Sequence, residues 1–344
     1  MAIETLPMAG APSNVNKAGL AKNDYRGNPT TLCQGCGHNS ISNQIITALY
    51  EMDIVPEDVL KFSGIGCSSK SPTYFLNRTF GFNSLHGRMP SIATGALFAT
   101  PNMRGIAVSG DGDTASIGMG QFKHIMRRNV NMVYIIENNG VYGLTKGQFS
   151  PTSPIGSVTK TSPYGTIENP FNIGELVIGA QGTFYARVLD TNPKLMSEVM
   201  YEAARHDGTS VIEIMQNCVI YNDKWYAGFT AKETRDDYQL ILKPGEKMIF
   251  GINKNKGLVM KDNKLKVVEI GKDATLDEVL THDPKEANHG LQLMLAEMMP
   301  PHFPVAFGVF RTIDRPTYDD LMEESIANAK STSDIKCVDD LLNS

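Results

Sequence analysis

The chain has 344 residues, of which 41% are hydrophobic and 20% are charged. This composition is typical of a soluble globular protein with room for one large α/β domain and an additional segment. The formal net charge of −5 gives no electrostatic reason to expect a nucleic-acid partner. No apolar run approaches the ~20 residues of a membrane span, and segment 1–20 lacks the apolar core of a signal peptide, so we expect a cytoplasmic protein.

In chain order, the pattern predicts three parts. Residues 1–22 mix Ala, Pro, Asn and Gly without a period, which predicts an extended arm. Residues 23–230 alternate between short β-branched runs and helical spacing, which indicates an α/β domain with a doubly wound, mostly parallel sheet. We expect residues 231–344 to be a C-terminal segment that wraps this domain and packs on a partner subunit. The expected helices are 40–52, 91–99, 173–181, 193–206 and 286–299; the expected strands are 59–65, 104–109, 132–136, 183–188 and 210–215, with a turn at 254–257.

Cysteines occur at the ends of several expected elements. Cys33 and Cys36 lie on a glycine-rich turn, Cys67 ends a strand, and Cys218 follows another strand. Loops at one edge of a parallel sheet can meet, and four thiolates suit either a [4Fe–4S] cluster or a tetrahedral Zn²⁺. Zinc sites usually take their second pair of ligands from another C-x-x-C, so we favour iron–sulfur. We expect Cys337, in a polar tail, to be a bystander.

The central stretch runs from 108 to 150 and indicates a diphosphate and metal site. The strand 104–109 stops at G-D-G, and a helix should follow, with Thr114 and Ser116 available to satisfy its first N–H groups. The next strand leads into E-N-N-G, which includes Asn139. In a parallel βαβ unit both strand ends face one crevice, where Asp111 and the oxygen of Asn139 offer hard ligands for Mg²⁺. The glycines and the helix N-terminus suit a diphosphate.

Simpler interpretations of these motifs exist. Asp-Gly and Asn-Gly are ordinary turn dipeptides. The run D-G-D-T-A-S also resembles the start of a calcium loop, but Ser116 replaces the required glycine and Phe122 replaces the required glutamate. The order of strand, GDG, helix, strand and NNG favours the diphosphate site.

That order resembles the thiamine diphosphate motif, in which GDG is followed about thirty residues later by NN. The resemblance implies that Asp111, Asn139 and the backbone carbonyl of Val141 hold Mg²⁺. It also implies a set of residues that contact the cofactor: Ser68, Gly110, Gly112, Asp113, Thr114, Gly143, Leu144 and Thr145.

Taken together, the motifs resemble the β subunit of the 2-oxoacid:ferredoxin oxidoreductases, in the 2-oxoglutarate branch. The matching stretches are C-Q-G-C-G-H, G-I-G-C-S-S-K, L-H-G-R-M-P-S-I-A-T-G, G-D-G-D, N-N-G-V-Y-G-L-T-K-G-Q-F-S-P-T and the segment around Cys218, spread over residues 25–230. The resemblance implies the thiamine diphosphate type of α/β fold and carries the ligands of a [4Fe–4S] cluster onto Cys33, Cys36, Cys67 and Cys218.

The resemblance also implies an activity. Such enzymes decarboxylate a 2-oxoacid, pass two electrons one at a time through the cluster to ferredoxin, and transfer the acyl group to coenzyme A. The same site can run in the CO₂-fixing direction. The carboxylate beside the aminopyrimidine comes from an α subunit, or a fused γα subunit, so we expect an (αβ)₂ assembly and an inactive isolated chain.

The expected substrate follows from the loop 142–148, which resembles the 2-oxoglutarate or broad-specificity branch. We expect Lys146, with Lys70, to attract the distal carboxylate of 2-oxoglutarate, although a lysine in a loop is as often a solvated charge. Pyruvate or broad specificity is the alternative. His38, His86 and Arg88 belong to the matching motifs and could line the active site or serve as structural hydrogen-bonding residues.

Two other classes remain open from the sequence. A non-oxidative thiamine diphosphate enzyme would not need the four cysteines. A zinc-bound interaction subunit would bind zinc and no thiamine cofactor.

Overall fold

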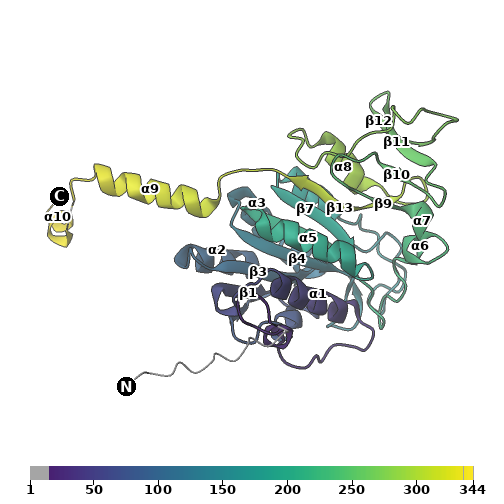
Figure 1. Ribbon diagram of the computed structural model, residues 1–344. Coiled ribbons are helices and arrows are strands. Elements are labelled where there is room, and N and C mark those ends of the chain that lie inside the picture. Colours follow the sequence, from purple (N-terminus) through teal and green to yellow (C-terminus); the bar gives the residue numbers. More distant parts are fainter. Residues whose placement is uncertain (1–14, 336, 344) are drawn as a thin grey trace, which may run out of the picture.

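A central sheet organises the molecule in the computed structural model, which describes residues 15–335 and 337–343 (Figure 1). The sheet has eight strands in the order β2-β1-β3-β4-β8-β7-β13-β9. Every neighbouring pair is parallel except β7 and β13, which are antiparallel. The strands are β1 (Val59–Ser63), β2 (Phe80–Asn83), β3 (Arg104–Gly110), β4 (Met132–Asn138), β7 (Phe184–Leu189), β8 (Thr209–Met215), β9 (Gln239–Ile241) and β13 (Val305–Thr312).

Helices cover both faces of this sheet, as expected for a doubly wound α/β fold. One face carries α1 (Gly37–Glu51) and α5 (Pro193–Arg205), which lie across the sheet in Figure 1. The opposite face packs against α2 (Met89–Ala99), α3 (Met119–Arg128), α4 (Ile173–Gly179) and α8 (Gly290–Glu297). The β-branched strands are buried on both faces, which explains their continuous apolar sequence. The predicted fold class is confirmed.

The GDG turn differs in detail from the expected helix start. After β3 the chain makes a π-helical turn, η4 (Asp113–Ile117), before α3 begins at Met119. No side chain caps either segment, so the capping role expected of Thr114 and Ser116 is wrong. Thr114 is buried, and its hydroxyl lies 3.0 Å from the hydroxyl of Tyr134. Such π-turns recur at functional sites because they re-aim the residues that they contain.

The C-terminal third adds strands to the same sheet. β13 pairs with β7, and β9 pairs with β13, so part of the segment expected to wrap the domain forms one edge of its core. A small antiparallel sheet follows β9, and the turn expected at 254–257 overlaps the start of its second strand. Its strands are β10 (Ile249–Phe250), β11 (Lys256–Lys261) and β12 (Lys264–Glu269). Helices α9 (Tyr318–Thr332) and α10 (Val338–Leu342) extend away from the body (Figure 1).

The remaining elements are short, and several of them border the site. These are η1 (Lys22–Tyr25), η2 (Pro56–Asp58), η3 (Ser68–Thr73), β5 (Val141–Tyr142), β6 (Gln148–Phe149), α6 (Ala227–Thr230) and α7 (Arg235–Tyr238). Of the expected N-terminal arm, residues 1–14 lie outside the described residues. Asn16 packs on the domain, since its side-chain amide donates to the hydroxyl of Tyr25 at 2.7 Å and to the carbonyl of Tyr50 at 2.8 Å.

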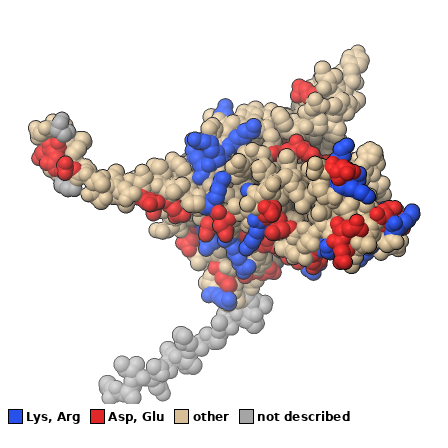
Figure 2. All heavy atoms as spheres, turned by 90° about the horizontal axis from the view of Figure 1, so that it is seen from above, with Lys and Arg blue, Asp and Glu red and all other residues tan. Residues whose placement is uncertain are grey.

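The surface carries charges of both signs. Figure 2 shows lysines and arginines interspersed with aspartates and glutamates on the face seen from above. This distribution agrees with the small net charge and offers no extended basic stripe on that face. Among the described residues, none of the helices has the length and apolar character required to cross a bilayer.

Candidate cofactor and cluster site

The expected site residues gather at the carboxyl edge of the sheet, where β1, β3 and β4 end. A cavity of about 70 Å³ lies there between the loops that follow these strands. The expected residues that line it are His38, Cys67, Ser68, His86, Gly110, Asp111, Gly112, Asp113, Asn139, Val141, Gly143, Leu144 and Thr145. The parallel sheet therefore brings together loops that are far apart in the sequence.

Asp111 is a buried carboxylate at the end of β3. Burial raises the pKa of its carboxyl, while hydrogen bonds from Ser150 and Thr152 lower it. The Thr152 hydroxyl donates to Asp111 Oδ2 at 2.7 Å and also lies 3.2 Å from Asn138 Oδ1. A buried carboxylate held in this way suits a bound cation, because a charge without a partner is costly in the interior. Sequence reasoning missed Thr152, although it lies in the matching stretch that ends in S-P-T.

The second aspartate of the motif has a different environment. Asp113 Oδ1 accepts the backbone N–H of Gly87 at 2.7 Å and lies 2.5 Å from His86 Nδ1. Asp113 Oδ2 accepts the hydroxyl of Ser109 at 2.5 Å. Asp113 thus connects the π-helical turn to the loop that carries L-H-G-R. Its contact with His86 holds that side chain at the cavity.

The N-N-G turn closes the other side of the cavity. Asn139 Oδ1 accepts the N–H of Val141 at 3.1 Å, and Gly140 has the positive φ of +63° that favours glycine. The hydroxyl of Tyr142 donates to the carbonyl of Gly112 at 3.0 Å. A Cβ atom on Gly112 would lie 2.3 Å from the Tyr142 ring, so only glycine fits between this ring and the end of β3. These contacts hold the two motif turns against each other.

The thiols of four cysteines lie at the same edge. A Cβ atom on Gly143 would lie 3.6 Å from Cys67 Sγ and 3.7 Å from Cys218 Sγ, so both sulfurs face this glycine. The pKa of the Cys36 thiol is raised to about 12, mainly by burial. A hydrogen bond from the His38 backbone acts in the opposite direction, and the charges of Cys218, Glu137 and Cys67 contribute to the rise. The charge of Cys33 likewise acts on Cys67.

The four side chains are thiols, which are the type of ligand that soft metal groups take. Four thiols that act on one another electrostatically would gain from a bound cation that stabilises their thiolates. Among the described residues, no three His, Cys, Asp or Glu side chains converge closely enough to hold a single metal ion. Cys337 lies apart in the exposed C-terminal segment.

The sequence analysis missed a buried pair of side chains, His38 and Glu137, that lines the cavity beside the Cys36 thiol. His38 Nε2 lies 3.2 Å from Glu137 Oε2, and His38 Nδ1 lies 3.0 Å from Cys36 Sγ. Burial lowers the pKa of His38 to about 4 and raises that of Glu137 well above its usual value. Burial therefore favours the neutral form of both side chains. The run E-N-N-G contains Glu137, but a glutamate beside a turn motif carries no signal of burial by itself.

The basic residues expected near the substrate lie outside the cavity lining. Lys70 and Lys146 are both exposed, and Lys146 adopts a positive φ of 79° in the loop just after Thr145. Arg88 is exposed and donates to the carbonyl of Ile117 at 3.4 Å. The structure thus brings most of the residues expected to bind the metal and the cofactor together around one cavity and leaves these three side chains at the periphery.

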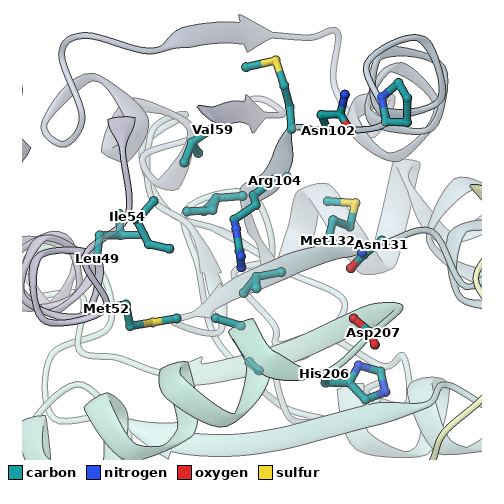
Figure 3. Close-up of a pocket in the computed structure, with 17 residues that line it drawn as sticks. Leu49, Met52, Ile54, Val59, Asn102, Arg104, Asn131, Met132, His206 and Asp207 are labelled. Carbon is teal, nitrogen blue, oxygen red and sulfur yellow. The ribbon is translucent and has the colours of Figure 1, made fainter. Parts of the chain in front are cut away.

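A separate cavity of about 260 Å³ lies at the opposite, amino edge of the sheet (Figure 3). Leu49, Met52, Ile54 and Val59 line one side, and Arg104, His206 and Asp207 supply its charged and polar groups. None of the residues expected at the functional site lines this cavity.

Comparison with known proteins agrees with this geometry. The family model "Thiamine pyrophosphate enzyme, C-terminal TPP binding domain" matches residues 64–214, which contain β3 and β4 and both turns of the cavity. A parallel sheet with GDG and NNG at its carboxyl edge and a match to this family define a thiamine diphosphate-binding subunit.

Individual relatives identify the family more specifically than the domain match does. The chain is 38% identical over 302 residues to "2-oxoglutarate oxidoreductase subunit KorB" of Mycobacterium tuberculosis, covering 88% of this chain and 80% of the relative. It is 35% identical to "2-oxoglutarate synthase subunit KorB" of Methanocaldococcus jannaschii, covering 69% and 84%. A solved 2-oxoglutarate:ferredoxin oxidoreductase from Magnetococcus marinus aligns with a TM-score of 0.74 and 29% identity over 94% of this chain and 95% of that chain. The chain therefore belongs to the family of 2-oxoacid:ferredoxin oxidoreductase β subunits.

Proposed function

We propose that this chain, assembled with an α subunit, carries out the coenzyme A-dependent oxidative decarboxylation of 2-oxoglutarate with ferredoxin as electron acceptor. The observation that carries the proposal is the placement of two sets of ligands at one sheet edge. Asp111 and Asn139 line the same cavity as Cys67, and Cys67 and Cys218 face the intervening loop at Gly143. The M. marinus oxidoreductase contains 2-oxoglutarate, coenzyme A and succinyl-CoA, which supports this substrate class.

Within this proposal, each set of residues has a role. Asp111, Asn139 and the Val141 carbonyl hold Mg²⁺ against the diphosphate, and the N–H groups of the GDG turn bind its oxygens. Cys33, Cys36, Cys67 and Cys218 hold a [4Fe–4S] cluster. When bound, thiamine diphosphate supplies the nucleophilic carbon for decarboxylation, and the cluster supplies one-electron transfer. The buried His38–Glu137 pair lines the cavity beside the Cys36 thiol.

The size of the cavity supports the need for a second subunit. At about 70 Å³ it is much smaller than the ~300–1,000 Å³ of pockets that enclose a whole cofactor. The chain therefore offers a half-site that binds the diphosphate and the metal, and the α subunit would cover the rest of the cofactor. An (αβ)₂ assembly and a cytoplasmic location are part of the same proposal.

Reconstitution tests the function directly. The purified chain, the α subunit and their complex are assayed anaerobically for ferredoxin reduction that depends on 2-oxoglutarate and coenzyme A. We expect turnover by the complex only, with pyruvate as the weaker substrate. Turnover by the isolated chain would contradict the claim that this chain provides only part of the cofactor site. CO₂ release without ferredoxin reduction would indicate a non-oxidative thiamine enzyme.

A further inference from the structure

The cavity at the amino edge of the sheet does not enter the proposed function. It lies where β1, β3 and β4 begin, and the last turns of α1 and α5 border it (Figure 3). The same strands end at the opposite edge, where the cofactor half-site lies, so the two sites are separate. Its volume of about 260 Å³ is slightly below the ~300–1,000 Å³ of pockets that enclose drug-sized ligands, which suits a small metabolite.

Aliphatic side chains form one wall of this cavity. Leu49 and Met52 come from the end of α1, Val59 from the start of β1, and Ala203 from the last turn of α5. Leu49, Val59 and Ala203 are buried, so the wall is a fixed part of the core. Such a wall gains free energy from covering an apolar group of a ligand and disfavours a charged one.

The cation of the cavity is Arg104, the first residue of β3. Figure 3 shows its side chain extending into the cavity, and it is the only lysine or arginine among the described residues that line it. Within the described part of the chain, its guanidinium has no ion pair and no hydrogen-bond acceptor. A guanidinium with free donors offers a planar fork to a carboxylate.

The negative charge of the cavity comes from Asp207 and from helix ends. Asp207 is exposed at the cavity, and its carboxylate has no ion pair with Arg104 or with any other described residue. The carboxyl ends of α1 and α5 point at the same space, and helix carboxyl ends favour a positive group. Both unpaired charges are thus available to one ligand that carries both signs.

His206 contributes to the wall and supplies no second cation. Its Nδ1 lies 3.0 Å from the Ser210 hydroxyl, and its Nε2 lies 3.3 Å from the carbonyl oxygen of Ile313. Burial lowers the pKa of the ring, which favours its neutral form. The ring is therefore held in place by the protein's own contacts, and Arg104 remains the group that attracts an anion.

We propose that this cavity binds a free α-amino acid with an aliphatic side chain of the size of leucine. Its carboxylate pairs with Arg104, its ammonium group lies near Asp207 and the helix ends, and its side chain packs on the wall of Leu49, Val59 and Ala203. A simple carboxylate fits less well because Asp207 repels it, and a simple amine fits less well because Arg104 repels it. The inference does not depend on the proposed function, since the two cavities share no lining residue.

The test titrates the full chain with L-leucine and with two analogues that each lack one charge. The analogue 4-methylpentanoate lacks the ammonium group, and 3-methylbutylamine lacks the carboxylate. Binding is measured by isothermal titration for the wild type, for Arg104→Gln and for Asp207→Asn. Arg127→Gln and Asp277→Asn are the matched controls, because both side chains are exposed and lie outside the cavity. The thermal unfolding midpoint of each variant is measured without ligand.

We expect L-leucine to bind the wild type and both controls with a Kd of about 1 mM or lower. Arg104→Gln and Asp207→Asn should each weaken this binding about tenfold or more, with unchanged unfolding midpoints, and each analogue should bind the wild type about tenfold more weakly than L-leucine.

The absence of saturable binding of L-leucine by the wild type would overturn the site, as would equal affinity for Arg104→Gln and the wild type. Binding of 4-methylpentanoate as tightly as L-leucine would overturn the amino-acid assignment and indicate a site for simple carboxylates. The turnover assay of the complex is separate, so failure of this site leaves the proposed function standing, and failure of turnover leaves this site standing.

Discussion

At the scale of single residues, the buried carboxylate of Asp111 depends on a hydroxyl that lies in another loop. We predict that Thr152→Val, which keeps the shape of the side chain and removes its donor, weakens the binding of Mg²⁺ and thiamine diphosphate by a factor of about 10 to 150, because a hydrogen bond to a charged group contributes roughly 1.5–3 kcal/mol. Isothermal titration of the chain with Mg²⁺ and the cofactor checks this result. Thr161→Val in the same loop is the control, because the Thr161 hydroxyl lies 3.3 Å from the Thr159 hydroxyl and makes no contact with Asp111. Equal affinity for the two variants would contradict the role of Thr152.

Lys146 gives a second prediction at this scale. It lies on the exposed loop directly after Thr145, which lines the cavity, so its charge is placed to act on a substrate at the cavity entrance. We predict that Lys146→Ala raises KM for 2-oxoglutarate up to about fivefold in the complex and leaves KM for pyruvate unchanged, since exposed ion pairs contribute about 0–1 kcal/mol.

Steady-state kinetics with both 2-oxoacids measure this preference. Lys160→Ala, which removes an exposed lysine from the neighbouring loop, controls for general charge effects. If Lys146→Ala left the preference for 2-oxoglutarate over pyruvate unchanged, Lys146 would be a solvated charge with no role in substrate binding.

Single residues also mark the limit of prediction from sequence. Asp111, Asn139 and the cysteines could be named because their spacing follows a motif. Thr152 and Glu137 could not, since their roles arise from contacts between segments that only the fold brings together, at Asp111 and at His38. Thr114 was assigned a capping role from its position, but the π-helical turn places its hydroxyl beside that of Tyr134.

At the scale of elements, helix α3 positions the GDG turn against the sheet. Phe122 on this helix is fully buried and packs edge-on against Tyr134 of β4, with ring centroids 5.4 Å apart. We predict that Phe122→Ala lowers the free energy of unfolding by about 3–5 kcal/mol, because the substitution leaves a cavity in the core. Urea denaturation provides the measurement. Phe80→Ala on the exposed edge strand β2 should change the same free energy by only about 0.5 kcal/mol or less. A loss of similar size for both variants would contradict this assignment of the core.

The long, periodic elements were the predictable ones. The expected strands at 104–109, 132–136 and 210–215 correspond to β3, β4 and β8, and the expected helices at 91–99 and 193–206 correspond to α2 and α5. The edge strand β2 and the three-residue β9 are too short to show a periodic pattern. β13 joins the sheet from far along the chain, so its pairing with β7 depends on tertiary contacts that local pattern does not encode.

At the scale of the whole molecule, the parallel sheet explains why one chain could hold two cofactors. Loops from β1, β3, β4 and β8 open on the same edge, so the hard ligands of the GDG and NNG turns and the soft thiols lie on neighbouring loops. Residues on these neighbouring loops would hold both groups close together, as one-electron transfer between them would require.

The measurement that tests this account most directly is anaerobic iron and sulfide analysis of the purified chain, with an EPR spectrum after dithionite reduction. We predict about four iron and four sulfide per chain and the signal of a reduced [4Fe–4S] cluster, held by Cys33, Cys36, Cys67 and Cys218. Zinc in place of iron, or no metal in an anaerobically prepared sample, would contradict the account and leave only a thiamine-binding half-site.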